Sequence, residues 1–406
     1  MALLSDTTAE CKYSGGTGEP NDPYRIATPQ DLNDIGNHQD DCNKYFVLVN
    51  DFNLAEYTGT QFNRIGTEAL PFSGVFDGND RKIWNFTWNS NGISYIGLFG
   101  YLGIGGQVKN LGMENVDVTV TNGWYVGGLI GYNEGTITNC HATGSVSGVA
   151  FTGGLVGYHV GGGIINCYST GSVGGEVGDV KGGLVGYAKN SEIINSYSTC
   201  SVSTGGKCVG GLVGLNSGGT ITNSYSSGTV SSTNFAVGGL LGINQENGTV
   251  SSCYSTGRVL GGIGKTGPIA GGLVGTMLYG MITASFWDIE TSGLNKSAGG
   301  TGKTTAEMKT MSTFINAGWD FVNIWDICEG TNYPRLRWQI PLSISMGDFV
   351  CPYGVDFMDF AVIASAWLSK PGEPDWNATC DISQPKDNFI NELDWAVLCE
   401  NWLEEM

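Results

Sequence analysis

The chain has 406 residues, of which 65 are glycine, and only 14% of its residues are charged. Its 38 acidic residues outnumber its 19 basic ones, which gives a formal net charge of −19. This charge excludes nucleic acid and anionic membrane surfaces as partners, because both require a basic surface. The sequence has no run of about 20 apolar residues, which excludes membrane insertion through a helix.

The first residues and the cysteines indicate the compartment. Residues 1–10 begin with Met-Ala-Leu-Leu, which we interpret as the remnant of a secretion signal joined to a start codon. The chain has 11 cysteines and no Cys-x-x-Cys pair, a usage typical of an oxidising compartment. We therefore expect a secreted or cell-surface protein.

Residues 11–95 are expected to form an N-terminal cap and the first coils of the repeat fold that follows. Thr28 before Pro29 predicts the start of a helix, with threonine as the cap and proline at the first helical position. Residues 45–49 predict a strand. A helix at this end would cover the open edge of a stacked fold.

A glycine motif recurs through residues 96–290 and predicts a stack of repeats. After a weaker copy at residues 96–100, the motif recurs in steps of 26, 29, 28, 28 and 33 residues, beginning at Gly127, Gly153, Gly182, Gly210, Gly238 and Gly271. The Gly, Ser, Thr, Val and Asn in these units exclude helical repeats. The period is also shorter than the roughly 40 residues of a propeller blade. The prediction is an all-β fold, a β-solenoid with coils of about 28 residues.

In a solenoid, equivalent residues form ladders about 4.8 Å apart. A buried leucine ladder would contain Leu129, Leu155, Leu184, Leu212, Leu240 and Leu273. An amide ladder at a bend would contain Asn139, Asn166, Asn195 and Asn223. A third ladder would contain Tyr168, Tyr197, Tyr225 and Tyr254, with His141 before it and Phe286 after it. The tyrosines either stack sugars or, as we favour, stack on one another to stabilise neighbouring strands.

The repeated residues resemble the GLUG motif, named for its glycine–leucine–hydrophobic–glycine core. That motif occurs in bacterial surface proteins and in the non-catalytic parts of immunoglobulin-A-cleaving metallopeptidases. The resemblance covers residues 96–290 and implies an extracellular repeat module without chemistry of its own. Residues 72–79 are similar to the opening coils of right-handed β-helices, which implies a right-handed solenoid.

Residues 291–341 are expected to close the C-terminal end of the solenoid. Thr304 and Glu307 have the spacing of a capping box, which predicts the start of a helix. The aromatic residues that follow would form this cap, and they are Trp319, Phe321, Trp325, Tyr333 and Trp338.

Residues 346–406 have a different composition and contain an internal duplication. Residues 359–368 match residues 394–403, and each segment predicts a helix that follows an acidic loop. The second loop has the spacing of an EF-hand with two extra residues, and its candidate calcium ligands are Asp381, Ser383, Asp387, Asn391 and Asp394. The first loop offers a weaker set, Asp348, Asp356 and Asp359.

This duplication resembles a dockerin, in which two calcium loops are each followed by a helix. The resemblance implies a small α-helical module that binds a cohesin-like extracellular protein. Cys351 and Cys380 lie at equivalent ends of the two loops, where a disulfide could replace the metal in holding the loops together. Two further candidate disulfides are Cys200–Cys208, which flank a strand-turn-strand, and Cys11–Cys42 near the N-terminus.

Several catalytic classes can be weighed from residue types alone. None of the three histidines has a ligand partner at helical spacing, which excludes a zinc peptidase of the His-Glu-x-x-His type. A glycosidase or polysaccharide lyase needs carboxylates gathered on one face, and residues 127–290 hold few. Another place for such a site is the N-terminal group of Asp51, Asp77, Asp80, Arg64 and Arg81.

The favoured hypothesis is a non-catalytic surface scaffold or adhesion protein with a C-terminal anchoring module. Its partner would be an extracellular cohesin-like protein or a glycan, its metal would be calcium in the C-terminal module, and we assign no catalytic residues. One alternative is a carbohydrate-active enzyme of the β-helix type. A second alternative is a self-assembling extracellular filament subunit.

Overall fold

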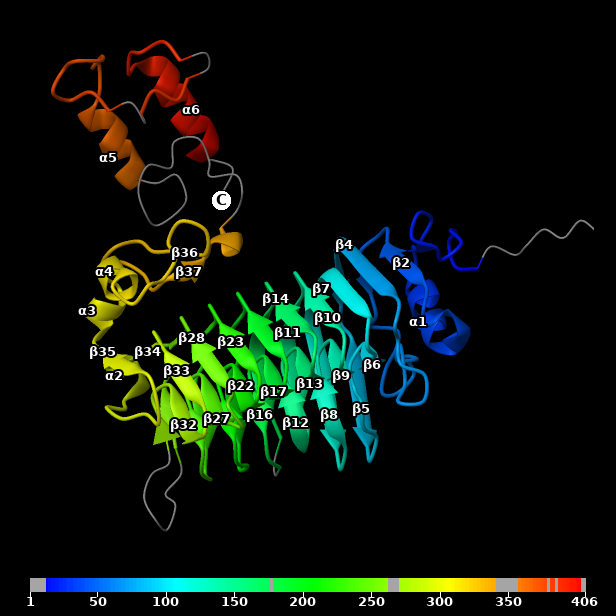
Figure 1. Cartoon of the computed structure of the whole chain (residues 1–406). Coiled ribbons are helices and arrows are strands. Elements are labelled where there is room, and N and C mark those ends of the chain that lie inside the picture. The colour runs from blue at the N-terminus through cyan, green and yellow to red at the C-terminus, as the bar shows by residue number, and fades with distance from the viewer. Residues whose placement is uncertain are drawn as a thin grey trace, which may run out of the picture. The chain divides into compact units, whose positions relative to one another are not determined.

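Parallel strand pairing repeats at the period of the glycine motif, so the chain forms a β-solenoid of about eight turns with coils of about 29 residues (Figure 1). The computed structural model describes residues 12–175, 178–261, 270–340, 357–377, 380–383 and 386–402. Contacts divide the chain into two units, with the boundary between Thr305 and Ala306. The predicted β-solenoid is confirmed, whereas its right-handed sense stays a prediction.

The coils stack their strands into three parallel sheets within the described residues. One sheet has seven strands, β6 (Phe99–Leu102), β9 (Ile130–Asn133), β13 (Val156–Val160), β17 (Val185–Lys189), β22 (Val213–Ser217), β27 (Leu241–Gln245) and β32 (Val274–Leu278). A second has six strands, β8 (Trp124–Gly127), β12 (Ala150–Gly153), β16 (Lys181–Gly182), β21 (Val209–Gly210), β26 (Val237–Gly238) and β31 (Ala270–Gly271).

The third and largest sheet joins the remaining strands of the solenoid. It contains β1 (Tyr24–Ile26), β2 (Tyr45–Leu48), β3 (Phe52–Asn53), β4 (Val75–Trp84), β5 (Thr87–Asn91), β7 (Gln107–Thr121), β10 (Thr136–Thr138), β11 (His141–Ser147), β14 (Gly163–Ile165), β15 (Tyr168–Gly174), β18 (Glu192–Ile194), β19 (Tyr197–Ser198), β20 (Ser201–Thr204), β23 (Thr220–Thr222), β24 (Tyr225–Ser226), β25 (Val230–Ser232), β28 (Thr249–Ser251), β29 (Tyr254–Ser255), β30 (Val259–Leu260), β33 (Met281–Thr283), β34 (Phe286–Asp288) and β35 (Thr301–Lys303). The strand predicted at residues 45–49 is therefore confirmed as β2.

Each glycine motif lies where one coil passes close to the next. A Cβ on Gly210 would overlap the carbonyl oxygen of Val213 and would lie 2.8 Å from the backbone of Leu240 in the following coil. The first glycines of the neighbouring motifs, Gly182 and Gly238, meet the same obstacle. Because backbone atoms cannot move aside alone, the corner requires glycine.

The leucine ladder is confirmed at the centre of this corner. All six leucines are completely buried. The amide of each of the first five donates to the carbonyl of the leucine in the next coil at 2.9–3.0 Å, and the series ends at Leu273. The motif thus supplies both the backbone approach and the apolar side chain that fills the interior.

The predicted asparagine ladder also forms, at left-handed bends. Asn139, Asn166, Asn195 and Asn223 have φ between 50° and 53°, a conformation that asparagine tolerates well. The Asn166 amide donates to the Asn139 side-chain oxygen at 3.1 Å, and Asn139 donates to Asn110 at 3.0 Å.

Small hydroxyl and thiol side chains follow each of these bends and bond the coils together. The backbone N–H of Cys167 donates to Ser196 Oγ at 3.1 Å, and that of Ser196 donates to Ser224 Oγ at 3.2 Å. Cys140 and Cys167 occupy this ladder as buried free thiols.

Short helices lie at both ends of the first unit. The predicted helix α1 (Pro29–Asn37) begins with a capping box between Thr28 and Asp31 and buries Leu32 and Ile35. The short 3₁₀ helix η1 (Gln39–Asp41) follows it. At the other end, Asp288 caps α2 (Ile289–Ser292), and β34 pairs in parallel with β35.

The second unit contains a small aromatic core and a pair of helices. Its first part holds α3 (Thr305–Met308), which spans the boundary, α4 (Met311–Ile315), the antiparallel strands β36 (Trp325–Asp326) and β37 (Arg335–Leu336), and η2 (Arg337–Gln339). Trp319 lies between Phe314 and Trp325, with ring centroids 4.7 and 4.5 Å away. Most of the expected 291–341 cap belongs to this unit, and its capping role stays a prediction.

The helical pair consists of α5 (Phe357–Ser365) and α6 (Glu392–Trp402), as the duplication predicts. Their shared core includes Ile363, Ile390 and Leu398, which are completely buried. Among the described residues, no helix is long and apolar enough to cross a membrane.

The close approach at the glycine corner gives a stability prediction. Gly210→Ala should destabilise the solenoid by about 3 kcal/mol or more, because its Cβ meets immobile backbone. Gly174→Ala is the control, since its Cβ would meet only Ser203 O at 3.6 Å. Urea unfolding measures both variants, and equal midpoints would show that backbone contact is not the reason for glycine.

His159 gives a pH prediction, because it is completely buried and burial lowers its pKa to about 4. Its Nδ1 lies 2.9 Å from Asn133 Nδ2, and its Nε2 has no hydrogen-bond partner among the described residues. Between pH 4 and 6.5 the unfolded chain binds a proton that the folded chain does not. Stability should therefore fall by on the order of 3 kcal/mol as the pH drops through this window.

His159→Asn should remove this pH dependence while keeping the fold. Its register neighbour Asn133 and the later Asn216 and Asn244 already place asparagine at this position. Urea midpoints measured from pH 4 to pH 7 test this expectation. An unchanged slope in the variant would assign the acid sensitivity to other groups.

Candidate functional site

The predicted tyrosine ladder forms, and its rings stack on one another. Successive centroids from Tyr168 to Tyr254 are 4.9 Å apart, and the ring planes lie within 7° of parallel. His141 stacks on Tyr168 at 4.5 Å. Tyr225 and Tyr254 are buried, and burial raises the pKa of Tyr168 to about 12. Because neighbouring rings cover one another's faces, the geometry favours a structural role, and sugar stacking here stays a prediction.

A second set of aromatic residues forms a surface that the sequence analysis missed. We call it the aromatic surface, and it consists of Tyr95, Tyr101, Trp124, Tyr125, Tyr132, Phe151, Tyr158 and Tyr187. Seven of these side chains are half-buried, and Trp124 is 53% exposed. Ring contacts connect the whole set, with centroids 4.5–6.5 Å apart. The available signal was a tyrosine directly after the last glycine of four motif copies.

The N-terminal charged residues serve the local backbone and do not form one site. The Arg64 guanidinium is largely buried over the Trp88 ring and donates to the carbonyl oxygens of Ser94 and Tyr95. Asp51 accepts from the backbone of Lys82 at 2.8 Å.

The other residues of that N-terminal group lie around a nearby bend. Asp77 accepts from the backbone of Asn79 at 2.9 Å and pairs with Lys109 at 3.1 Å, as expected for a turn residue. Asp80 and Arg81 line a cavity of about 110 Å³. Asp77 is thus engaged by the backbone and by Lys109, whereas Arg64 contacts a different set, Trp88, Ser94 and Tyr95.

Glu114 is a half-buried carboxylate that the sequence analysis did not single out. It accepts from Thr143 Oγ1 at 2.7 Å and His141 Nε2 at 3.1 Å, and it pairs with Lys82 at 3.2 Å. Burial alone would raise its pKa, but these three partners outweigh burial and lower the pKa of Glu114. A carboxylate held ionised in this way is a poor general acid.

The second acidic loop brings three of its five predicted ligands together. Carboxylate oxygens of Asp381, Asp387 and Asp394 lie within 4.8 Å of one another. Asp394 also accepts backbone N–H bonds from Ile382, Ser383 and Asn391 at 2.7–3.0 Å. This aspartate therefore joins the loop to the first turn of α6.

Two polar atoms of this loop are buried without a partner among the described residues. They are Asp381 Oδ1 and Ser383 Oγ, on side chains that are at least nine-tenths buried. Such atoms ordinarily require a hydrogen bond or a ligand. The oxygen-rich set fits a hard cation such as calcium. Asn391 is used differently, because its Oδ1 accepts from Leu393 and its Nδ2 donates to Asp387.

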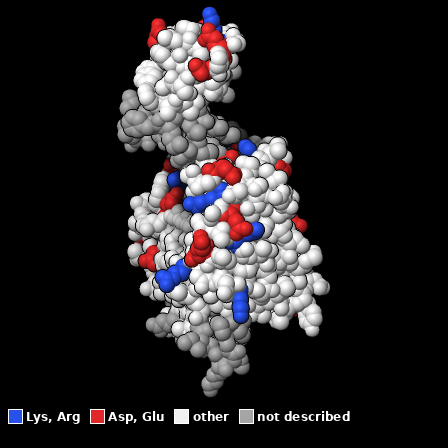
Figure 2. Space-filling view, turned by 90° about the vertical axis from the view of Figure 1, so that its left-hand side faces the viewer, with Lys and Arg blue, Asp and Glu red and all other residues white. Residues whose placement is uncertain are grey.

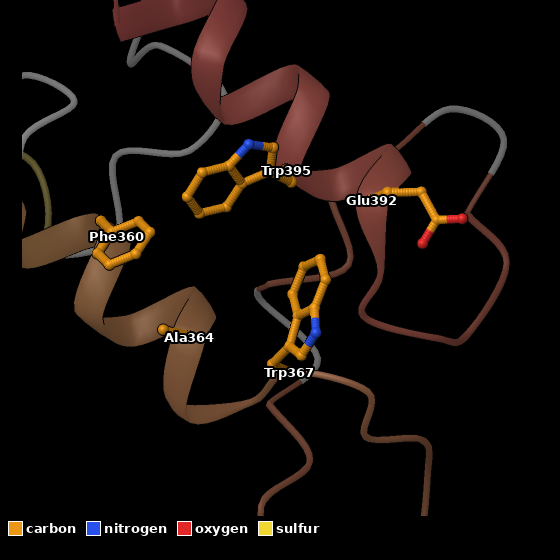
Figure 3. Close-up of a pocket in the computed structure, with 5 residues that line it drawn as sticks. All are labelled: Phe360, Ala364, Trp367, Glu392 and Trp395. Carbon is orange, nitrogen blue, oxygen red and sulfur yellow. The ribbon is translucent and has the colours of Figure 1, made fainter.

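An apolar pocket of about 530 Å³ lies between α5 and α6 (Figure 3). Phe360, Ala364 and Trp367 line it from one side, and Glu392 and Trp395 line it from the other. The Trp395 and Phe360 rings meet edge to face with centroids 4.9 Å apart, and Trp367 is 40% exposed.

The first acidic loop lies largely outside the described residues, which include neither Asp348 nor Asp356. Asp359 is buried in α5. Cys351 also lies outside the described residues and Cys380 is buried, so their disulfide stays a prediction.

The other two disulfide predictions are not met. Cys200 and Cys208 are free thiols, because Cys200 belongs to one core cluster with Val202 whereas Cys208 packs against another cluster with Val180. Cys42 is a buried free thiol, and Cys11 lies outside the described residues.

The distribution of charge agrees with the sequence composition. Figure 2 shows Lys and Arg interspersed with Asp and Glu on an otherwise uncharged face. No broad basic area is present on that face.

Comparison with known proteins identifies the repeats. The GLUG motif family matches residues 122–147, 205–231 and 233–260, so GLUG repeats form the β-solenoid. Halomucin from Haloquadratum walsbyi is 34% identical over 148 residues, which are 35% of this chain and 2% of halomucin. A "Putative Gly-rich membrane protein" from Evansella cellulosilytica is 36% identical over 131 residues, which are 31% of this chain and 15% of that protein.

The chain thus covers only a small part of these two relatives. Among solved structures, the crystal structure of a "putative immunoglobulin A1 protease" from Bacteroides ovatus matches with a TM-score of 0.57. The match covers 80% of this chain and 95% of that chain at 22% identity. This likeness shows the fold alone.

Proposed function

We propose that this protein is a non-catalytic, secreted or surface-associated scaffold that attaches to an extracellular protein through its C-terminal helical pair. The observation that carries the proposal is the acidic loop joined to the apolar pocket. We assign calcium to the loop and an apolar side chain of a cohesin-like partner to the pocket. The solenoid supplies a rigid support.

One turn of α6 connects the loop to the pocket. Asp394 holds the backbone of the acidic loop, while the next residue, Trp395, lines the pocket together with Glu392. An ion bound by Asp381, Asp387 and Asp394 would fix this turn and therefore the position of the Trp395 ring. Docking should consequently depend on calcium.

The comparisons support a surface location. One relative is named a "Putative Gly-rich membrane protein". The repeats of this chain are nearly free of charged side chains, and Asp51, Asp77 and Glu114 bond to the backbone or to neighbouring side chains. These features favour a scaffold over a carbohydrate-active enzyme.

Calcium binding is tested on the full chain by isothermal titration calorimetry. Asp387→Asn should weaken calcium binding at least about tenfold, because it removes one charged ligand from an exposed position. Asp375→Asn is the matched control, since Asp375 is exposed and outside the cluster.

Docking is measured with a recombinant cohesin domain, and Trp367→Ala should abolish it without affecting calcium binding.

Three results would contradict this proposal. One is the absence of calcium heat in the unaltered chain. Another is equal calcium affinity in the Asp387→Asn and Asp375→Asn variants. The third is cohesin binding that persists after chelation.

The enzyme alternative has its own test. The full chain should release no new reducing ends from a panel of acidic and neutral polysaccharides, because Asp51 and Asp77 bond to the backbone and Glu114 is held ionised. Release from any one substrate would make the protein an enzyme. The Glu114→Gln variant would then show whether Glu114 takes part.

A further inference from the structure

We infer that the aromatic surface binds a neutral polysaccharide chain lying along the axis of the solenoid. The inference rests on the proposed surface role and adds a ligand to the solenoid itself. It concerns the eight aromatic residues defined above, not the tyrosine ladder on β15, β19, β24 and β29.

The arrangement of the rings distinguishes the two sets. In the tyrosine ladder every ring lies parallel to its neighbours. In the aromatic surface, rings within one row stack with interplanar angles of 9–27°, as in Tyr101–Tyr132–Tyr158 and Tyr125–Phe151–Tyr187. Other pairs cross instead, with Trp124 at 85° to Tyr125 and Tyr187 at 84° to Tyr158. In a crossed pair the edge of one ring points at the face of the other, so the ring that offers its edge keeps its own faces free of that partner. The C–H face of a sugar can pack against aromatic faces of this kind, whose π-electrons are negative.

The backbone shows that three of these rings are not required by the fold. Tyr95, Tyr125 and Phe151 occupy the same corner with φ of 62°, 60° and 50°, a costly conformation for an aromatic residue. Later coils hold this corner with Cys208 and Ala236 at φ of 56° and 61°. The corner therefore forms without a ring, and the rings need another explanation.

The neighbouring polar groups favour a neutral ligand rich in hydroxyl groups. Burial, followed by a hydrogen bond to the exposed Glu68, raises the pKa of Tyr95 well above its ordinary value. Burial and the half-buried Glu134 have the same effect on the pKa of Tyr101. The two carboxylates offer acceptors to sugar hydroxyls. An anionic chain would be repelled by this surface.

The length of the surface favours a polymer over a small molecule. Tyr101, Tyr132, Tyr158 and Tyr187 are in register on β6, β9, β13 and β17, so they follow the solenoid axis across four strands. The next two residues in register, Leu215 and Ile243, are buried aliphatic side chains. The surface thus has a defined end and presents a row of contacts to a chain of sugars.

Affinity electrophoresis of the full chain tests this inference. Gels contain xyloglucan, galactomannan or hydroxyethylcellulose as neutral probes and polygalacturonate as the anionic one. The Trp124→Ala/Tyr187→Leu variant installs the residues that the next coil holds in register, Ala150 and Leu215. It should weaken retardation by a neutral probe at least about tenfold. Tyr197→Leu, which removes a ring from the tyrosine ladder, should leave retardation unchanged.

The controls separate this inference from the calcium-dependent docking. Chelation should leave retardation by the neutral polysaccharide intact, because the acidic loop is not part of the aromatic surface. Retardation by none of the three neutral probes would overturn the inference. So would equal retardation of the double variant, or retardation only by polygalacturonate. Unfolding in urea at the unaltered midpoint shows that the double variant is folded.

Discussion

The close approach of backbone to backbone at each glycine corner is the constraint on which the solenoid depends. The corner leaves no room for a Cβ, and the leucine that follows fills the interior of the coil. This contact sets how each coil aligns with the next, and therefore the register of the other ladders. Extra residues are therefore tolerated only away from it, and the longest step between motif copies has its additional residues between β30 and β31.

This constraint explains why the fold could be predicted from the sequence. A backbone contact restricts residue type more strongly than an apolar contact does, so the motif repeats almost unchanged in six copies. Asparagines at left-handed bends give a second signal of the same kind. The start of α1 was predictable too, because capping is a local interaction between residues three apart.

The candidate sites were only partly predictable, because they depend on which cluster of the folded chain each side chain enters after a turn. Cys200 and Cys208 are close in sequence, yet the turn between them sends their sulfurs into different clusters. In the acidic loop, spacing alone grouped Asn391 with the aspartates, although its side chain caps the next helix and bonds to Asp387. The aromatic surface could not be predicted because its residues occupy two separate positions, one before the glycine motif and one after it. Only the structure shows that the rings from these two positions contact one another.

Two aromatic sets on one solenoid differ because of where each set lies in the coil. Tyrosines on a strand have identical neighbours above and below, so equal side-chain conformations stack them in parallel and close the ladder. Rings at a corner contact the rings of the adjacent strand at nearly right angles, as Tyr125 does with Tyr132 and Tyr158. The faces of these rings are therefore only partly covered. The backbone accepts Phe151 or Ala236 at the same corner. A solenoid of this kind can therefore change its surface one residue per coil without altering the glycine corner that holds the coils together.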